Sequence, residues 1–244
     1  MAIYDRIGVG YADLRVPDAR IAHQIAQALG TGTVLNVGAG AGSYEPETTV
    51  AAVEPSPVML AQRPQGAAPA VQAVAEALPF ADHQFDATLA VLTTHHWTDP
   101  GRGLAELERV SRRQVVLTWD QELWASSYWV LTDYLPEAAE REKDVAALST
   151  VLAHWPDAQV LPVPVPHDGT DGFFAAYWRR PEAYLVPAVR DAISGLALLE
   201  QDLVEPAMDR LRADLADGSW LRRRGDLLER NELDCGYRLV VHDS

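Results

Sequence analysis

The chain has 244 residues, and its 20 Lys and Arg against 35 Asp and Glu give a formal net charge of −15. With 48% hydrophobic and 23% charged residues, the composition is typical of a globular protein, and the length suits one domain over residues 1–244. The acidic balance argues against nucleic acid as a partner and against docking on an anionic membrane.

The first half of the sequence alternates between helical and strand patterns. Residues 18–29 predict a helix with Asp18 as its cap, and shorter helical patterns lie at 57–63 and 103–112. Apolar runs typical of buried strands occupy 33–37, 49–53, 70–74, 85–92 and 114–119. This alternation favours a mainly parallel sheet with helices on both faces.

The second half adds a helix at 137–153, a strand at 159–165, a helical stretch at 171–230 and a strand at 236–242. Pro162 and Pro164 fall inside the first of these strands, which predicts an edge or irregular position for it. The sequence thus contains seven candidate strands, with a helical segment inserted between the last two. We expect residues 1–31 to form a helical cap, 32–120 the ligand-binding half, 121–170 and 231–244 the rest of the sheet, and 171–230 a helical lid.

Cys235 is alone, so the chain has no intramolecular disulfide and no thiolate metal cluster. No grouping of His, Cys and carboxylate residues has the spacing of a metal site, so we expect no metal. The start of the chain lacks the apolar core of a signal peptide, and no apolar run is long enough to cross a bilayer. These observations predict a cytoplasmic protein.

The glycine-rich segment after the first strand carries the strongest functional signal. VLNV at 34–37 runs into Gly38-Ala39-Gly40-Ala41-Gly42, and the next strand ends at Glu54. Glycine lets a backbone turn sharply and touch a ligand, and an acid at the tip of the second strand can accept hydrogen bonds from a ribose diol. Residues 36–56 therefore predict a nucleoside pocket at the carboxyl edge of the sheet.

Two features indicate which nucleoside this is. A dinucleotide fingerprint has a third glycine where this chain has Ser43, and the segment between Gly42 and Val50 is too short for a full helix whose dipole could hold a pyrophosphate. S-adenosylmethionine, which has no phosphate, fits better. A nicotinamide-dependent oxidoreductase stays open as the alternative.

At this point the sequence resembles a family, the class I S-adenosylmethionine-dependent methyltransferases, and within them the type 11 group of small-molecule enzymes related to ubiquinone and menaquinone biosynthesis. The resemblance covers about residues 33–120 and rests on the segments VLNVGAGAGSY (34–44), VAAVEPSPVMLAQR (50–63), AEALPFADHQFDATLAVLTTHHWTDP (75–100) and GLAELERVSR (103–112). It implies a Rossmann-like fold whose seven-stranded, mainly parallel sheet has helices on both faces, and a lid over the acceptor.

The resemblance also implies roles for individual residues around S-adenosyl-L-methionine, whose product is S-adenosyl-L-homocysteine. The expected cofactor-binding residues are Gly38, Ala39 and Gly40 at the methionine part, Glu54 at the ribose, Ser56 and Met59 at adenine, Leu92 at the methionine tail, the neighbouring Pro55, Ala75 and Glu76, and Tyr11 and Arg15 in an N-terminal cap. Asn36 and Val74 stand where many members have Asp, which keeps a non-catalytic protein that binds the same cofactor as a second alternative.

The sequence indicates the residues around the acceptor less specifically than those around the cofactor. His95 and His96 follow the fourth strand and have the pKa range of a general base, although a structural role is the other interpretation. His167, Tyr177, Trp178 and Arg179 open the helical segment and are candidates for an acceptor site with an arginine facing an anionic group. Trp119 and Trp124 could form an aromatic wall or a packed hinge.

We therefore predict an enzyme that transfers a methyl group from S-adenosylmethionine to a small-molecule acceptor by in-line displacement. Its partners would be that acceptor alone, with no nucleic acid and no membrane, and it would act as a monomer or homodimer.

Overall fold

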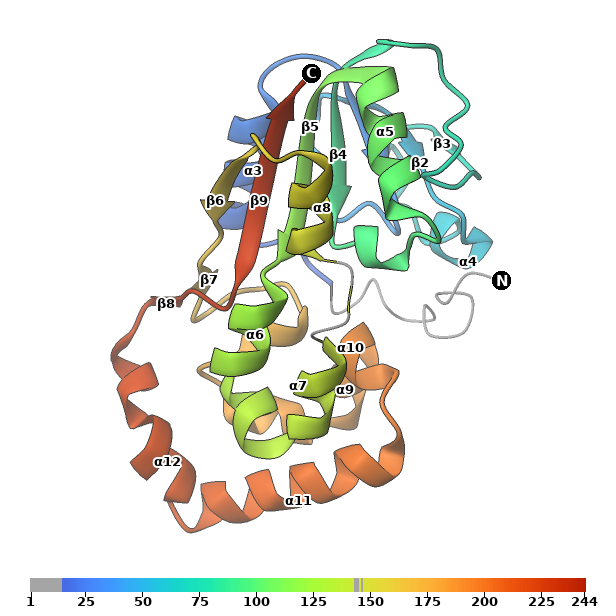
Figure 1. Ribbon diagram of the computed structural model, residues 1–244. Helices are drawn as coiled ribbons and strands as arrows, with labels where there is room; N and C mark the ends of the chain where they lie inside the picture. The colour runs from blue at the N-terminus through green and yellow to red at the C-terminus, as the bar shows by residue number, and fades with distance from the viewer. Residues whose placement is uncertain (1–14, 143–144, 146) are drawn as a thin grey trace.

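Seven strands form the central sheet of the computed structural model, which describes residues 15–142, 145 and 147–244 (Figure 1). Their order is β3-β2-β1-β4-β5-β9-β6. β9 is antiparallel to both of its neighbours, whereas the pairs from β3 to β5 are parallel. The strands are β1 (Val34–Val37), β2 (Thr49–Val53), β3 (Ala70–Val71), β4 (Phe85–Val91), β5 (Ser111–Trp119), β6 (Gln159–Pro162) and β9 (Tyr237–Asp243). The predicted Rossmann-like fold class is confirmed.

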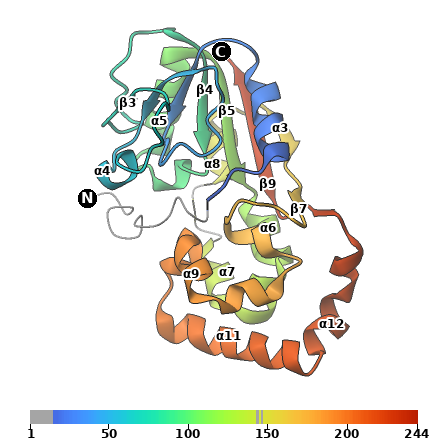
Figure 2. The same ribbon diagram turned by 180° about the vertical axis from the view of Figure 1, so that it is seen from behind.

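Helices cover both faces of this sheet, so the central strands β1, β4 and β5 are buried along most of their length instead of alternating. On one face α3 (Ala19–Leu29) buries Ile21 and Ile25, and Asp18 caps it by accepting a hydrogen bond from the Arg20 amide. On the other face α5 (Pro100–Val110) and α8 (Leu148–His154) bury Leu104 and Val151 (Figures 1 and 2). Two apolar cores therefore fix the sheet between its helices.

β6 lies at the edge of the sheet, where the prolines of its sequence predict it. It pairs with β9 alone among the described strands, and it ends at Pro162. An edge strand has one free side, so a missing amide donor costs it little. Beyond it, β7 (Val165–Pro166) pairs with β8 (Glu232–Leu233) in a separate two-stranded ribbon.

The other helices gather beyond the carboxyl ends of the parallel strands, at the bottom of Figure 1. They include α6 (Gln121–Ser127), η2 (Val130–Tyr134) and α7 (Pro136–Glu142), followed later in the chain by η3 (Phe174–Tyr177), η4 (Pro181–Leu185), α9 (Pro187–Ala192), α10 (Ser194–Ala197), α11 (Gln201–Ala216), α12 (Ser219–Arg224) and η5 (Gly225–Glu229). We call these elements together the helical region. α4 (Pro57–Leu60) and η1 (Thr94–His96) lie at the sheet edge instead.

Residues 121–142 belong with the helical region and not with the sheet, to which the sequence pattern assigned them. Their aromatic side chains are buried against the later segment: the Trp129 indole donates to the Trp178 carbonyl at 2.9 Å, and the Tyr128 hydroxyl contacts that of Tyr184. The helical region is thus built from two separate stretches of chain. No helix in the described part of the chain has the length and apolar character needed to span a bilayer.

Candidate active site

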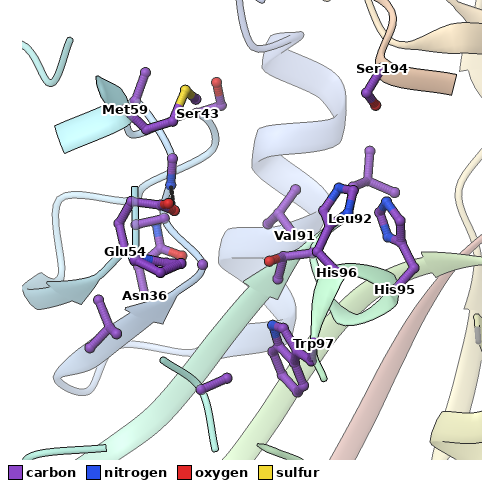
Figure 3. A pocket seen from close by; sticks show the side chains of 18 of the residues that line it. Asn36, Ser43, Glu54, Met59, Val91, Leu92, His95, His96, Trp97 and Ser194 are labelled. Carbon is purple, nitrogen blue, oxygen red and sulfur yellow. Dashed lines mark hydrogen bonds between the residues drawn. The ribbon is translucent and has the colours of Figure 1, made fainter. Parts of the chain in front are cut away.

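A cavity of about 1120 Å³ lies where the carboxyl ends of the parallel strands face the helical region. One side is formed by the segments after β1, β2 and β3, and the other by the ends of β4 and β5 together with the helical region and the start of β9. Figure 3 shows Asn36, Glu54 and Met59 on the first side, and His95, His96 and Ser194 on the second. We call these the strand side and the helical side.

The glycine loop after β1 is held by its backbone. Both the Gly38 and Ala39 amides donate to the Val53 carbonyl at 2.9 Å. Gly38 has a φ of +68°, and a Cβ there would lie 2.1 Å from Thr93 Oγ1. No larger residue fits this position without displacing Thr93, so the loop can pass close to the end of β4 only because residue 38 is glycine.

Glu54 is fixed at the tip of β2. Its carboxylate is 5% exposed and accepts hydrogen bonds from the Gly40 amide at 2.9 Å and the Ser56 amide at 2.8 Å (Figure 3). A carboxylate oxygen can accept more than one hydrogen bond, so both oxygens can still receive hydroxyl donors from the cavity. This is the arrangement that a ribose diol requires.

The amide side chain of Asn36 is explained by a neighbouring residue, Glu45, that was not predicted from the sequence. Its amide nitrogen donates to Glu45 Oε2 at 3.2 Å, and Glu45 forms an ion pair with Arg63 at 2.9 Å in which both side chains are less than one-tenth exposed. An amide satisfies this carboxylate, whereas an Asp at residue 36 would repel it. The acid that many similar proteins carry at the end of β1 is therefore replaced here by an Asn–Glu–Arg arrangement below the glycine loop.

The segment after β3 completes the strand side. Ala75 and Glu76 line the cavity, as does Val74, which is 47% exposed. The Glu76 carboxylate accepts from the amides of Thr98 at 2.6 Å and Asp99 at 3.1 Å, so it joins this segment to the start of α5.

Three further predicted cofactor residues lie in α4 or just before it. Met59 and Pro55 line the cavity, whereas Ser56 is buried outside its lining and caps α4 by accepting from the Met59 amide at 3.3 Å. Tyr11 lies outside the described residues.

Arg15 lines the cavity and is the one Lys or Arg that does so among the described residues. Its Nε lies 2.6 Å from Asp171 Oδ1, with side chains 8% and 0% exposed. The same two residues form an isolated backbone bridge. Asp171 and burial also raise the pKa of Tyr44, which follows the glycine loop. The Arg15–Asp171 pair therefore connects the glycine loop with the entry to the helical region.

The two predicted catalytic histidines lie on the helical side, just beyond Leu92. Leu92 has a φ of +48°, a strained conformation for a leucine, and its amide donates to the Leu117 carbonyl at 2.8 Å. The His95 and His96 rings are 3.7 Å apart, and His95 packs edge-on against Trp119 at 4.7 Å (Figure 3).

Burial determines the protonation of both histidines. It lowers the pKa of His96 to about 4, and burial together with the neighbouring His96 lowers the pKa of His95 well below its usual range. Both rings are therefore neutral near neutral pH. His95 Nδ1 and Trp119 Nε1 are buried without a hydrogen-bond partner among the described residues.

The four predicted acceptor-binding residues do not line the cavity; they hold the helical region together. Trp178 is fully buried and donates to the Val165 carbonyl at 3.0 Å. Arg179 donates to the Arg230 carbonyl at 2.9 Å, and His167 Nδ1 lies 3.0 Å from the Asn231 carbonyl. The Arg180 guanidinium carbon lies over the Tyr177 ring, 4.9 Å from the centre of that ring. Their side chains are engaged at the β7–β8 ribbon and in the helical region, so the expected acceptor site does not form there.

Other aromatic residues line the helical side of the cavity. The lining of the helical side includes Trp119, Trp124, Phe173, Phe174 and Tyr237, joined by Val145, Ile193, Ser194, Gly195 and Leu198. Trp119 and Trp124 were candidates for this wall from the sequence. The lining residues from α10 and β9 could not be predicted from a local sequence pattern, because only the packing of distant segments brings them to the cavity.

Comparison with known proteins identifies the chemistry that this cavity serves. The family described as "Methyltransferase domain" matches residues 28–118. A crystal structure from Anabaena variabilis, described as a methyltransferase of an antibiotic biosynthesis pathway, is 34% identical, with a TM-score of 0.87 over 95% of this chain and 99% of that one. This chain belongs to the class I S-adenosylmethionine-dependent methyltransferases, in the type 11 group.

A second solved structure shares the methyltransferase fold at much lower identity. Geranyl diphosphate C-methyltransferase from Streptomyces coelicolor, crystallised with Mg²⁺, a substrate analogue and S-adenosyl-L-homocysteine, is 13% identical, with a TM-score of 0.50 over 92% of this methyltransferase and 75% of that chain. No curated protein matches the sequence at a significant level.

The site fits the cofactor of this methyltransferase, S-adenosylmethionine. The glycine loop leaves no Cβ in the way, Glu54 offers two fixed acceptor oxygens, and Arg15 offers a cation. These are the partners that the backbone contacts, ribose hydroxyls and carboxylate of the cofactor need. With the family shown, the nicotinamide-dependent alternative has no remaining support.

Proposed function

We propose that this methyltransferase acts on a small-molecule acceptor bound on the helical side of the cavity. The observation that carries the proposal is the cavity itself: at about 1120 Å³ it exceeds the roughly 300–1,000 Å³ typical of a site for one ligand. It also has two chemically different sides, which suits a cofactor and an acceptor held together.

The residues of the strand side would bind and orient the cofactor. Glu54 would accept the ribose hydroxyls, the backbone of Gly38, Ala39 and Gly40 would pass along the methionine part, and Arg15 would pair with its carboxylate. Met59 and Ala75 would pack near adenine. S-adenosylmethionine supplies the activated methyl group when bound.

The residues of the helical side would hold the acceptor's nucleophile in line, with the reacting atoms about 3–3.5 Å apart. His95 and His96 are our candidates for this task. As neutral imidazoles they can accept a hydrogen bond from the nucleophile across the physiological pH range. Because burial lowers their pKa values, they are weak bases, which suits an acceptor that loses its proton easily.

We further propose a cytoplasmic protein that acts as a monomer or homodimer and has no nucleic-acid partner. The support is indirect: the net charge of −15, and a single cysteine, Cys235, whose thiol is free and buried.

Calorimetric titration with S-adenosylhomocysteine tests the cofactor side. The wild-type protein should bind it and should bind neither NAD nor NADP. Glu54→Gln should weaken binding about ten-fold or more, because hydrogen bonds to a charged group contribute about 1.5–3 kcal/mol. Glu47→Gln, at an exposed glutamate outside the cavity lining, is the matched control and should bind normally.

Turnover tests the transferase assignment against a non-catalytic binding protein. Radiolabelled methyl groups from the cofactor should appear in an organic extract of small molecules when a panel of acceptors is supplied. If the protein binds S-adenosylhomocysteine but transfers no methyl group to any member of a broad panel, the non-catalytic alternative gains support.

A further inference from the structure

The helical side of the cavity differs from the strand side in charge. Three side chains that carry a formal charge line the cavity among the described residues: Arg15, Glu54 and Glu76. None of them belongs to the elements that form the helical side. The lining residues from the ends of β4 and β5, the helical region and β9 include no Asp, Glu, Lys or Arg in the described part of the chain.

The walls of this side are aromatic and fixed in place. The Phe173 ring packs edge-on against the Tyr237 ring, with ring centres 4.9 Å apart. The Trp124 ring packs in the same way against the Phe174 ring, with ring centres 5.2 Å apart. α10 lies close to this wall, because a Cβ at Gly195 would be 3.1 Å from the Phe174 ring. Buried, interlocked rings leave a shaped apolar surface that offers large contact area at little cost in side-chain entropy.

The polar groups on this side are all uncharged. They include the hydroxyls of Thr93, Ser194 and Tyr237, the neutral imidazoles of His95 and His96, and the indoles of Trp119 and Trp124. His95 Nδ1 and Trp119 Nε1 have no hydrogen-bond partner in the described part of the chain, and a buried polar group left unpaired costs about 1–3 kcal/mol. A ligand hydroxyl or carbonyl that settled in this corner would supply a partner.

The rim of the same side is apolar as well. Leu198 lines the cavity and is 46% exposed, so it adds apolar surface at the rim. The one described cation of the lining, Arg15, is already paired with buried Asp171. Among the described residues, a charged acceptor on the helical side would therefore lose its water without gaining a further counter-charge.

We propose that the acceptor is an uncharged, flat and largely apolar molecule that presents a hydroxyl or carbonyl group to the His95–Trp119 corner, an inference that rests on the proposed function. This replaces the anionic acceptor expected from Arg179, which lies outside the cavity lining.

A matched pair of probes tests this acceptor class. The protein is first saturated with S-adenosylhomocysteine, which lacks the sulfonium charge, so that the titration reports what the protein's own side chains select. It is then titrated calorimetrically with 2-naphthol, which is uncharged near neutral pH, and with 2-naphthoate, which has the same rings and a negative charge. We expect 2-naphthol to bind and 2-naphthoate to bind about ten-fold more weakly or not at all.

A second test of the acceptor class places a charge on the helical side of the cavity. Ser194→Asp puts a carboxylate at the first residue of α10, a position where helices tolerate acids, so folding should be preserved. It should weaken 2-naphthol binding about ten-fold or more and change S-adenosylhomocysteine binding little. Ser219→Asp makes the same change at the first residue of α12, outside the cavity lining, and should alter neither.

The outcomes separate the two proposals. If the wild-type protein does not bind S-adenosylhomocysteine, the proposed function fails before the acceptor is tested. If it does bind, the acceptor inference is overturned by 2-naphthoate binding as tightly as 2-naphthol, by 2-naphthol failing to bind, or by Ser194→Asp leaving 2-naphthol affinity unchanged.

Discussion

Asn36 shows how one residue of the cofactor pocket depends on a partner outside it. Its amide satisfies Glu45, which in turn pairs with Arg63, so the three side chains form a unit below the glycine loop. Asn36 is thus suited to its surroundings, because an amide at this residue satisfies a buried carboxylate that an acid would repel.

Asn36→Asp should destabilise the protein more at neutral than at acidic pH. Two carboxylates in contact raise the pKa of one of them above its unfolded value, so the folded variant loses stability as pH rises through about 4 to 6. We expect a loss of about 1–3 kcal/mol near pH 7, seen as a lower Tm in thermal denaturation. Asn231→Asp, at an exposed asparagine, is the control. A difference in Tm that does not grow with pH would contradict this account.

His96 predicts a second pH effect, opposite in direction. Its folded pKa of about 4 lies below the model-peptide value of 6.5, so the unfolded chain binds a proton that the folded protein does not. This contribution to stability is complete above pH 6.5 and is lost as pH falls toward 4. It amounts to at most about 3 kcal/mol.

His96→Gln should remove that part of the acid sensitivity. Denaturant melts of wild type and variant between pH 4 and 6.5 would measure it, with the exposed His23→Gln as the control. If wild type and His96→Gln lose stability in parallel over this range, His96 is not the group responsible.

At the scale of elements, the site depends on how closely the loop after β1 passes the end of β4. The sequence predicted this junction well, because a buried apolar run, a glycine turn and an acid at the next strand end are all local patterns. The same holds for the cap Asp18 and for the edge position of β6. The details of contact, such as Thr93 against Gly38, are tertiary and leave no trace in a local pattern.

Gly38→Ala should damage this junction more than the backbone strain alone explains. Gly38 and Gly218 have similar φ values, +68° and +77°, so alanine strains both by about 1–2 kcal/mol. A Cβ at Gly38 also meets Thr93 Oγ1 at 2.1 Å, whereas one at Gly218 lies 3.4 Å from the flexible end of the Arg222 side chain. We expect Gly38→Ala to lower Tm further than Gly218→Ala and to weaken S-adenosylhomocysteine binding in calorimetry. Equal effects of the two variants would show that the contact with Thr93 is unimportant.

Across the whole molecule, the cavity has one side made locally and one side assembled from afar. The strand side comes mainly from consecutive segments between β1 and the residues just after β3, and local sequence patterns predicted most of it. The helical side joins Trp124, Phe174, Ser194 and Tyr237, which are far apart in the chain. Residue type alone suggested His167 and Arg179 for this role, but their backbone positions direct them to the β7–β8 ribbon. Tertiary packing decides such a choice.

At the scale of the whole molecule, the Arg15–Asp171 ion pair connects the glycine loop with the entry to the helical region. Asp171→Asn would remove the buried charge partner that Arg15 has at 2.6 Å, and breaking a buried ion pair costs about 3 kcal/mol or more. Asp168→Asn removes a partner of Arg20 from an exposed ion pair and should leave Tm nearly unchanged. Thermal denaturation of the two variants compares them directly, and similar losses of Tm would contradict a special role for the buried pair.

The same pair should affect only ligands that carry the amino-acid tail. Asp171→Asn should weaken S-adenosylhomocysteine more than 5′-methylthioadenosine, which lacks the tail and its carboxylate. Calorimetric titration with both ligands gives the ratio. An equal loss for both would mean that Asp171 supports the pocket as a whole and does not position Arg15 for the carboxylate.

The position of β9 between β5 and β6 has a consequence for synthesis on the ribosome. β9 follows every helix from η3 to η5 in the chain, yet it fills the gap between two strands made earlier. Until it emerges, β6 has no partner among the described strands and β5 has one open edge, so the nascent chain exposes unpaired edges of both strands to its neighbours. Stalled or truncated products that lack β9 should therefore be the aggregation-prone species and the natural clients of chaperones.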